Sequence, residues 1–257
     1  MTRESRPGQP ALYDTIGVGY RELRRPDPRL AAVVRAGLGD ARSVLNVGAG
    51  AGSYEPGAEA HDVLAVELSA EMIAQRGPES APVVQASATA LPIATDSFDA
   101  CLAILTVHHW PDRGRGLEEL RRVARGPVVL LTWDPAALGF WLTDYFPDIL
   151  DIDRRIFPDA AELERHLGRL DQRPVPIPAD CTDGFLGAYW RRPEAYLRDA
   201  VRAVISTFHK LDDPAPGLAR LASDLATGAW HERYGDVLER TELDLGYRLV
   251  VAPGTEL

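Results

Sequence analysis

Short apolar runs alternate with amphipathic stretches over the first half of the chain. The runs have the length of buried strands, and they cover residues 43–47, 63–67, 83–86, 98–105 and 128–133. Between the last two, Leu117, Leu120 and Val123 recur at the spacing of one helical face, which predicts a helix over 113–125. Strands that alternate with helices indicate a parallel sheet covered on both faces.

Helical patterns flank this region on both sides. Before it we expect short helices at 11–20 and 27–39, the second opened by Asp27 as the capping residue and Pro28 at the first helical position. After it we expect helices at 136–150, 159–170, 192–210 and 217–238, and strands at 174–177 and 243–251. The helical stretch from 185 to 239 therefore interrupts the sheet and is a candidate lid.

The chain length sets the scale of the fold. At 257 residues the chain is long enough for one large domain or a core plus a subdomain, because single cores stop growing at roughly 250 to 300 residues. We expect four units along the chain. They are a helical cover (1–40), the sheet core (41–180), the helical lid (181–241), and the last strand with its tail (242–257).

Charge and composition exclude several classes of protein. The formal net charge is −10, and the 28 lysines and arginines are scattered, which disfavours a nucleic-acid partner. The amino terminus lacks an apolar signal segment, and no stretch reaches the roughly 18 apolar residues of a membrane span. Cys101 and Cys181 lie far apart, so no metal site is implied. We expect a cytoplasmic protein with no membrane partner; the oligomeric state cannot be read.

The strongest motif follows the first predicted strand. Gly48, Gly50 and Gly52 form a GxGxG run, in which glycine lets the backbone turn tightly and approach a ligand. Fifteen residues beyond Gly52, Glu67 ends the second predicted strand, where a carboxylate can accept hydrogen bonds from ribose hydroxyls. Together they indicate a nucleoside cofactor, and dinucleotide enzymes use the same arrangement.

Four ordered segments then resemble the class I S-adenosylmethionine-dependent methyltransferases, in particular the group that includes ubiquinone and menaquinone methyltransferases. The segments are Asn46–Gly52, Ala65–Ser69, Ala88–Asp99 and Leu105–Trp110. The resemblance spans residues 13–134, and 243–251 resembles the last, antiparallel strand of the family. It implies an α/β, Rossmann-like three-layer sandwich with a seven-stranded, mostly parallel sheet and a helical lid insertion. It also implies methyl transfer from S-adenosylmethionine to a small-molecule acceptor, such as a secondary metabolite.

The resemblance also implies roles for individual residues. The backbone of Gly48, Ala49, Gly50 and Gly52 would hold the methionine end of the cofactor, and Glu67 the ribose. The remaining cofactor contacts would come from residues after later strands: Leu68, Met72, Ser87 and Ala88 at the adenine, and Leu105 and Thr106 near the methyl group. We hypothesise that Tyr13, Tyr20 and Arg25 close over the cofactor, with the arginine pairing to its carboxylate; packing tyrosines and a solvated arginine are the alternative.

One position departs from the family pattern. Ser87 stands where the family usually has an acidic residue, so the acceptor for the adenine amino group is weakened to a hydroxyl. A hydroxyl can still accept one hydrogen bond, and losing the charge costs about 1 kcal/mol. The departure bears on cofactor affinity rather than on the fold.

The pair His108–His109 is the candidate for acid–base chemistry. Histidine is the side chain best suited to take a proton near neutral pH, and methyl transfer needs a base only where the acceptor must lose a proton. We favour His109 as the base, with Trp110 as a wall of the site. The alternative is that both histidines position the loop by hydrogen bonds.

Aromatic and ionisable groups also gather around the candidate lid, at 183–185, 189–190 and 230–234. They are suited to an acceptor pocket, although helix packing explains them equally well. Two other functions remain open. One is an NAD(P)-dependent oxidoreductase on a related fold, which the GxGxG spacing and the His-His-Trp segment disfavour. The other is a non-catalytic S-adenosylmethionine-binding protein, with Ser87 as its support.

Overall fold

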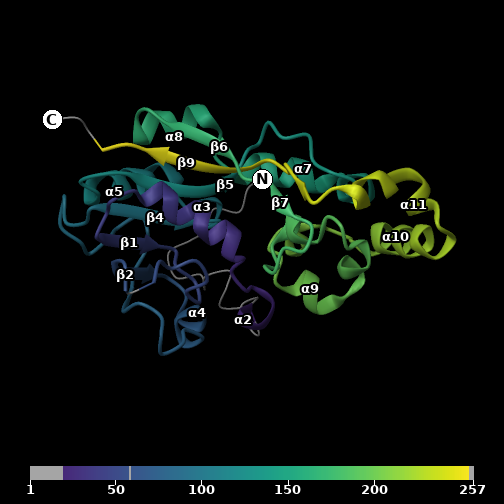
Figure 1. Cartoon of the computed structure of the whole chain (residues 1–257), viewed down its shortest axis with the longest axis horizontal. Coiled ribbons are helices and arrows are strands. Elements are labelled where there is room, and N and C mark those ends of the chain that lie inside the picture. Colours follow the sequence, from purple (N-terminus) through teal and green to yellow (C-terminus); the bar gives the residue numbers. More distant parts are fainter. Residues whose placement is uncertain (1–19, 58, 255–257) are drawn as a thin grey trace.

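The computed structural model describes residues 20–57 and 59–254, and seven of its strands form one sheet in the order β3-β2-β1-β4-β5-β9-β6 (Figure 1). The first five strands pair in parallel, and β9 runs antiparallel to both β5 and β6. This confirms the expected seven-stranded, mostly parallel sheet. The strands are β1 (Ser43–Val47), β2 (Asp62–Glu67), β3 (Val83–Gln85), β4 (Ala100–Ile104), β5 (Val128–Trp133), β6 (Asp171–Pro174) and β9 (Tyr247–Ala252).

The order of the strands determines where a ligand can bind. The chain moves outward from β1 through β2 to β3, and then crosses back to place β4 on the other side of β1. The connections that leave β1 and β4 therefore diverge and open a crevice at the carboxyl ends of these two strands. The glycine run follows β1, and the His108–His109 pair follows β4, so both motifs lie at this crevice.

Each face of the sheet has its own apolar layer, because alternate side chains of a strand point to opposite faces. On one face Leu45, Cys101 and Leu130 pack against α5 (Arg113–Val123) and α8 (Ala160–Leu167). On the other face lies a cluster that includes Val44 and Val129, and α3 (Pro28–Leu38) covers it. The result is the expected three-layer sandwich.

The inserted helices lie between β7 (Ile177–Pro178) and β8 (Glu242–Leu243), two short strands that pair antiparallel. They are η2 (Leu186–Tyr189), η3 (Pro193–Leu197), α9 (Asp199–Ala203), η4 (Phe208–Lys210), α10 (Ala215–Thr227), α11 (Ala229–Tyr234) and η5 (Gly235–Glu239). Figure 1 shows α9, α10 and α11 gathered at one end of the molecule, away from β1 and β2. Trp190, Tyr196 and Trp230 are fully buried in the same cluster as Val129, so the insertion shares the core of that face.

The remaining helices are α2 (Tyr20–Leu23), α4 (Ala70–Ala74), η1 (Val107–His109), α6 (Leu142–Tyr145) and α7 (Asp148–Ile156). The expected start of α3 is confirmed, since the Asp27 side chain accepts a hydrogen bond from the backbone N–H of Arg29. Most of the expected helix at 11–20 lies outside the described residues. The short connection from Gly52 to β2 contains only turns among the described residues.

Three of the long helices predicted after the central strands are each divided into shorter helices, so the prediction of continuous helices is wrong. The helix predicted at 136–150 begins only at Leu142, because Gly139 adopts φ +82°, and Pro147 divides the rest into α6 and α7. Gly228, with φ +86°, separates α10 from α11 inside the helix predicted at 217–238. The region 192–210 forms three short pieces, because Arg198 is extended.

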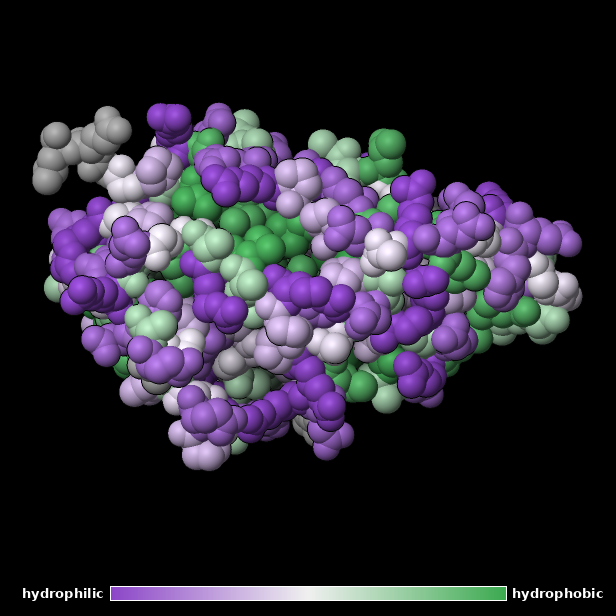
Figure 2. Space-filling view, viewed as in Figure 1, coloured by the Kyte–Doolittle hydropathy of each residue, from purple (hydrophilic) through white to green (hydrophobic). Residues whose placement is uncertain are grey.

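The face of the molecule shown in Figure 2 is mainly hydrophilic. On the face shown, apolar side chains gather over α3 and the neighbouring strands. Val33, a residue of α3, is one of the exposed large apolar residues. None of the helices in the described part of the chain has the length and apolarity needed to cross a bilayer.

Candidate cofactor and acceptor site

The loop after β1 fits closely against the chain that leaves β4. Gly48 has φ +70° and donates a hydrogen bond of 2.8 Å to the Val66 carbonyl of β2. A Cβ atom placed on Gly48 would lie 2.1 Å from Thr106 Oγ1, far inside van der Waals contact. Only glycine therefore fits between these two loops, and this contact positions the crevice between β1 and β4.

Glu67 ends β2 with its carboxylate held by the backbone. Oε2 accepts from Gly50 N, and Oε1 accepts from Leu68 N and Ser69 N, each at 2.8 Å. A carboxylate has about four acceptor positions, so three are filled and about one remains for a ligand hydroxyl. The side chain is 9% exposed, which means that it is oriented before any ligand arrives.

A buried ion pair holds the glycine loop in place. The sequence did not predict this pair. Arg76 and Glu55 pair with side chains that are 5% and 7% exposed. Arg76 also donates to the Gly50 carbonyl at 3.1 Å, and Glu55 accepts from the Asn46 amide at 3.4 Å. These bonds hold the loop from its carbonyl groups, while the N–H groups of Gly48 and Ala49 donate to the Val66 carbonyl.

A cavity of about 480 Å³ occupies this crevice, within the usual range for small-molecule sites. Most of the residues that the sequence assigns to the cofactor line it: Tyr20, Gly48, Ala49, Gly50, Glu67, Leu68, Met72, Ser87, Ala88, Leu105 and Thr106. His109 and Trp110 line it as well. Residues from four separate loops therefore meet in one cavity.

Two of the expected cofactor residues, Gly52 and Arg25, do not line this cavity. Tyr13 lies outside the described residues. Gly52 lines a neighbouring groove instead, where Ser80 Oγ would meet a Cβ atom at 3.1 Å. Arg25 is exposed, and its Nε donates to the Glu22 carbonyl at 3.1 Å. Arg24, and not Arg25, lines the cavity.

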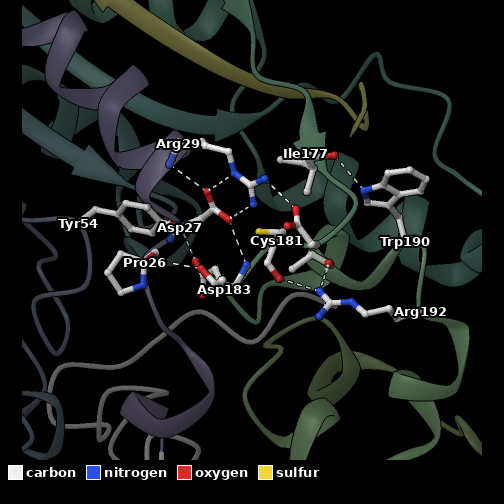
Figure 3. Close-up of polar contacts among 12 residues, drawn as sticks. Pro26, Asp27, Arg29, Tyr54, Ile177, Cys181, Asp183, Trp190 and Arg192 are labelled. Carbon is white, nitrogen blue, oxygen red and sulfur yellow. Dashed lines mark hydrogen bonds and ion pairs between the residues drawn. The ribbon is translucent and has the colours of Figure 1, made fainter. Parts of the chain in front are cut away.

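Arg24 is fixed by a network that the sequence did not reveal. Its Nε donates to Asp183 Oδ1 at 2.7 Å, and its guanidinium lies 4.9 Å from the centre of the Tyr20 ring. Asp183 also accepts from the Tyr54 hydroxyl at 2.8 Å (Figure 3). Burial and the Asp183 charge raise the pKa of Tyr54, so its hydroxyl stays protonated and donates. The network joins the segment before α3 to the start of the insertion.

A second set of bonds reinforces that junction. Asp27 accepts from the Arg29 guanidinium and from Thr182 N, and Arg29 also pairs with Asp180 at 2.7 Å (Figure 3). The hydrogen bond from Arg29 lowers the pKa of Asp27 to about 2, so this carboxylate is charged at any pH at which the protein is used. The amino-terminal segment and the insertion therefore pack as one unit.

Ser87 lies on the cavity with its hydroxyl already in a local bond. Ser87 Oγ accepts from Thr89 N at 3.2 Å and lies 2.8 Å from Thr89 Oγ1. A hydroxyl has two acceptor positions, so one can still serve a ligand when Ser87 is the donor in its contact with Thr89 Oγ1. The predicted contact to an adenine amino group remains a prediction.

His108 and His109 form the short helix η1 after β4, with their ring centres 3.8 Å apart. His108 stacks on Phe157 at 4.0 Å, and its buried Nδ1 has no hydrogen-bond partner among the described residues. Burial, and then the charges of Lys210 and Arg24, lower the pKa of His109 to about 3. Both rings are therefore neutral near pH 7, and His109 is a weak base.

Leu105, directly after β4, lies between the 480 Å³ cavity and a second, smaller cavity, and it lines both. It has φ +48°, a left-handed conformation that costs a non-glycine residue about 1 to 3 kcal/mol. Its backbone N–H still donates to the Leu131 carbonyl at 2.8 Å, which holds the turn in place. A strained residue at this point is typical of a functional site.

The second cavity has a volume of about 60 Å³ and adjoins the first through Arg24, Leu105 and His109, which line both. Its walls are mainly apolar and aromatic, and include Trp133, Phe140, Ile149, Leu150, Phe157, Phe185, Ile205, Leu245 and Tyr247. Two buried polar side chains, Asp153 and Thr207, also line it. Of the aromatic groups that the sequence singled out near the insertion, Phe185 reaches this wall, whereas Trp190 and Trp230 are core residues.

Comparison with known proteins places this arrangement in a family. Residues 45–131 match the methyltransferase domain family. The chain is also 32% identical to a candidate methyltransferase from an antibiotic biosynthesis pathway of Anabaena variabilis ATCC 29413, over 89% of this chain and 98% of that one, with a TM-score of 0.81. The chain belongs to the class I S-adenosylmethionine-dependent methyltransferases. The expected family and fold are thus confirmed.

Other relatives share less with this methyltransferase. It is 34% identical to the chloroplastic 2-methyl-6-phytyl-1,4-hydroquinone methyltransferase 2 of rice, Oryza sativa subsp. japonica. This identity extends over 67 residues, or 26% of this chain. The match spans 19% of the length of the rice protein. The cyclase SpnF, at 17% identity and a TM-score of 0.53 over 98% of this chain and 99% of SpnF, shares the fold.

Proposed function

We propose that the methyltransferase binds S-adenosylmethionine in the 480 Å³ cavity and transfers its methyl group to a small molecule that enters the adjoining cavity. The observation that carries this proposal is the convergence of the glycine loop, Glu67 and the β4 turn on one cavity. A second cavity shares Leu105 and His109 with the first, as a reaction between two bound molecules requires. Proximity and alignment supply much of the rate in such a transfer.

The residues present fit the cofactor. The space beside Gly48 is filled by Thr106, so only a glycine fits there and the loop brings its backbone to the cavity without a side chain in between. Glu67 would hold a ribose hydroxyl, and Leu68, which is 47% exposed, would cover an apolar ring face. When bound, S-adenosylmethionine would supply an electrophilic methyl group with a neutral thioether as the leaving group.

The chain itself has two tasks in this reaction. Arg24, fixed by Asp183, and Leu105, fixed by its bond to Leu131, would separate and align the two molecules. His109 lies where a base would be needed, but its pKa of about 3 makes proton uptake near pH 7 unfavourable. The weak basicity supports the alternative that the histidines are structural residues that position the loop.

The two rival functions make different predictions about ligands. A nicotinamide-dependent oxidoreductase would bind NAD or NADP, whereas a non-catalytic protein would bind S-adenosylmethionine without methylating any acceptor. The family match and the Anabaena relative support the methyltransferase over the oxidoreductase. A small-molecule acceptor is supported by the enclosed shape and apolar walls of the second cavity.

Calorimetric titration with S-adenosylmethionine, S-adenosylhomocysteine, NAD and NADP tests the proposal. We expect micromolar binding of the first two, which corresponds to about 8 kcal/mol, and none of the others. Glu67→Ala should weaken that binding by tenfold or more, roughly the loss of one hydrogen bond to a charged group. Glu164→Ala, which removes an exposed carboxylate on α8, is the matched control and should bind as the wild type does. Methyl transfer from labelled cofactor then identifies acceptors.

A further inference from the structure

Asp153 is a carboxylate buried in an apolar wall. It is 4% exposed, and it lies on α7 in the lining of the 60 Å³ cavity. Thr207 donates a hydrogen bond of 3.0 Å to Asp153 Oδ1. The residues described here make no other hydrogen bond to this carboxylate and bring no cationic group within 4.0 Å of it. One of its oxygens is therefore left without a protein partner.

The surroundings make this arrangement costly. Ile149, Phe157 and Ile205 line the same cavity, and a buried charge without a partner is strongly disfavoured in such a medium. The charge of Lys210, on η4, favours the ionised form of Asp153, but the two side chains form no ion pair. Burial outweighs both Lys210 and the Thr207 bond and raises the pKa of Asp153 to about 6. An unpaired, perturbed carboxylate in a cavity is typical of a group that acts on a ligand.

The position of the cavity indicates which ligand this is. The cavity is separate from the proposed cofactor cavity but shares Arg24, Leu105 and His109 with it. A group bound beside Asp153 is thus adjacent to the proposed methyl donor. His108 contributes a second polar atom to this region, because its Nδ1 is buried without a partner in the described structure. Burial lowers the pKa of both His108 and His109, so each ring is a weak base and neither competes with Asp153 for the proton.

We propose that Asp153 binds the acceptor of the methyltransferase by taking a hydrogen bond from its nucleophilic O–H or N–H group, and that it receives that proton during transfer. This inference rests on the proposed function. As the acceptor oxygen or nitrogen bonds to the methyl carbon, the carbon–sulfur bond of the donor breaks with its electron pair going to sulfur. The O–H or N–H bond breaks, and its proton passes to Asp153, which returns it to solvent.

The cavity also restricts the shape of the acceptor. A volume of about 60 Å³ holds only a few water-sized groups, so the reactive end of the acceptor enters and not a large molecule as a whole. Trp133, Phe157 and Phe185 on the walls favour an apolar, aromatic carrier for the hydroxyl or amino group. The structure therefore favours phenols and aryl amines over carbon or sulfur nucleophiles.

Matched pairs of probes test this inference without knowledge of the natural acceptor. Phenol and anisole, and aniline and N,N-dimethylaniline, differ in whether they can donate a hydrogen bond. Their binding is measured by ligand-observed NMR, with and without S-adenosylhomocysteine, to wild type and Asp153→Asn. Asp151→Asn serves as the control, because Asp151 is an exposed carboxylate on the same helix with a side chain that is 71% exposed. The phenol and aniline arms distinguish oxygen from nitrogen as the acceptor atom.

We expect phenol or aniline to bind about tenfold more tightly than its capped counterpart, and Asp153→Asn to abolish that preference while Asp151→Asn keeps it. Equal binding within both pairs, an unchanged preference in Asp153→Asn, or no binding of any probe would overturn the role of Asp153. If the wild type does not bind S-adenosylhomocysteine, this result would instead contradict the proposed function. Unchanged S-adenosylhomocysteine affinity in Asp153→Asn would show that this variant is folded.

Discussion

Arg24 and Asp183 form an ion pair of 2.7 Å with side chains only 10% and 0% exposed. The pair links the segment before α3 to the start of the insertion, 159 residues later in the chain. Arg24 lines both cavities. The bond therefore joins the segment before α3 to the insertion at the point where donor and acceptor would meet. The site is thus formed by the edge of the sheet, by the segment before α3 and by the insertion.

Removing the buried acid of this pair should destabilise the protein. Asp183→Ala removes an acceptor of both the Arg24 guanidinium and the Tyr54 hydroxyl, and breaking a buried pair in this way costs about 3 to 5 kcal/mol. Urea unfolding measures the effect. Asp180→Ala, which removes a carboxylate 81% exposed, should change the free energy of unfolding by less than about 1 kcal/mol. Equal effects of the two substitutions would show that the network contributes little.

Gly48→Ala should abolish cofactor binding, because its new Cβ would overlap Thr106 Oγ1 at 2.1 Å and force the two loops apart. Gly39→Ala is the matched control. Gly39 also has a positive φ, +58°, but nothing lies within 4 Å of its added Cβ. Both positions have φ values that residues with a Cβ rarely adopt, so both substitutions carry a backbone cost. Calorimetry should find cofactor affinity lost in Gly48→Ala and retained in Gly39→Ala. Retained affinity in both variants would show that the contact between Gly48 and Thr106 is not needed for cofactor binding.

Ser87→Asp should tighten the binding of S-adenosylmethionine by roughly fivefold to tenfold. A carboxylate at this position accepts a charge-assisted hydrogen bond, about 1 kcal/mol stronger than that of a hydroxyl. It can also keep the bond that Thr89 N now makes to Ser87 Oγ. Calorimetric titration of both proteins measures the change. Unchanged affinity would mean that the adenine amino group does not reach this position.

Asp153→Asn should stabilise the protein as it removes function. The pKa of Asp153 rises from about 3.8 unfolded to about 6 folded, so its charged form disfavours the folded state. The wild type therefore loses stability as pH rises from about 4 to above 6, by up to about 3 kcal/mol. The advantage of Asp153→Asn in urea unfolding should grow between pH 5 and pH 8. A constant or negative difference would contradict the raised pKa.

The sequence predicted the parts of the site that depend on local pattern. The glycine run, Glu67 and the His108–His109 pair each follow an apolar strand, and parallel strands bring such segments to one edge of the sheet. The same reasoning could not choose between Arg24 and Arg25, because the segment around them has no periodic pattern. It predicted the helical insertion but not the break between α10 and α11, since Gly228 interrupts an otherwise continuous helical pattern.

Asp153 had a signal that the sequence reasoning overlooked. It lies next to Ile152 and four residues after Ile149, so it falls on the apolar face of its helix, where a charge is out of place. Asp183 had no such signal. Its partner Arg24 lies 159 residues away, and only the packing of the insertion against the amino-terminal segment brings them together.

The most direct test of the central claim is calorimetric titration of the wild-type protein with S-adenosylmethionine, with NAD as the control. The account predicts one site per chain with micromolar affinity for S-adenosylmethionine, weakened tenfold or more by Glu67→Ala, and no heat with NAD. Binding of NAD, or no binding of S-adenosylmethionine by the folded protein, would contradict it.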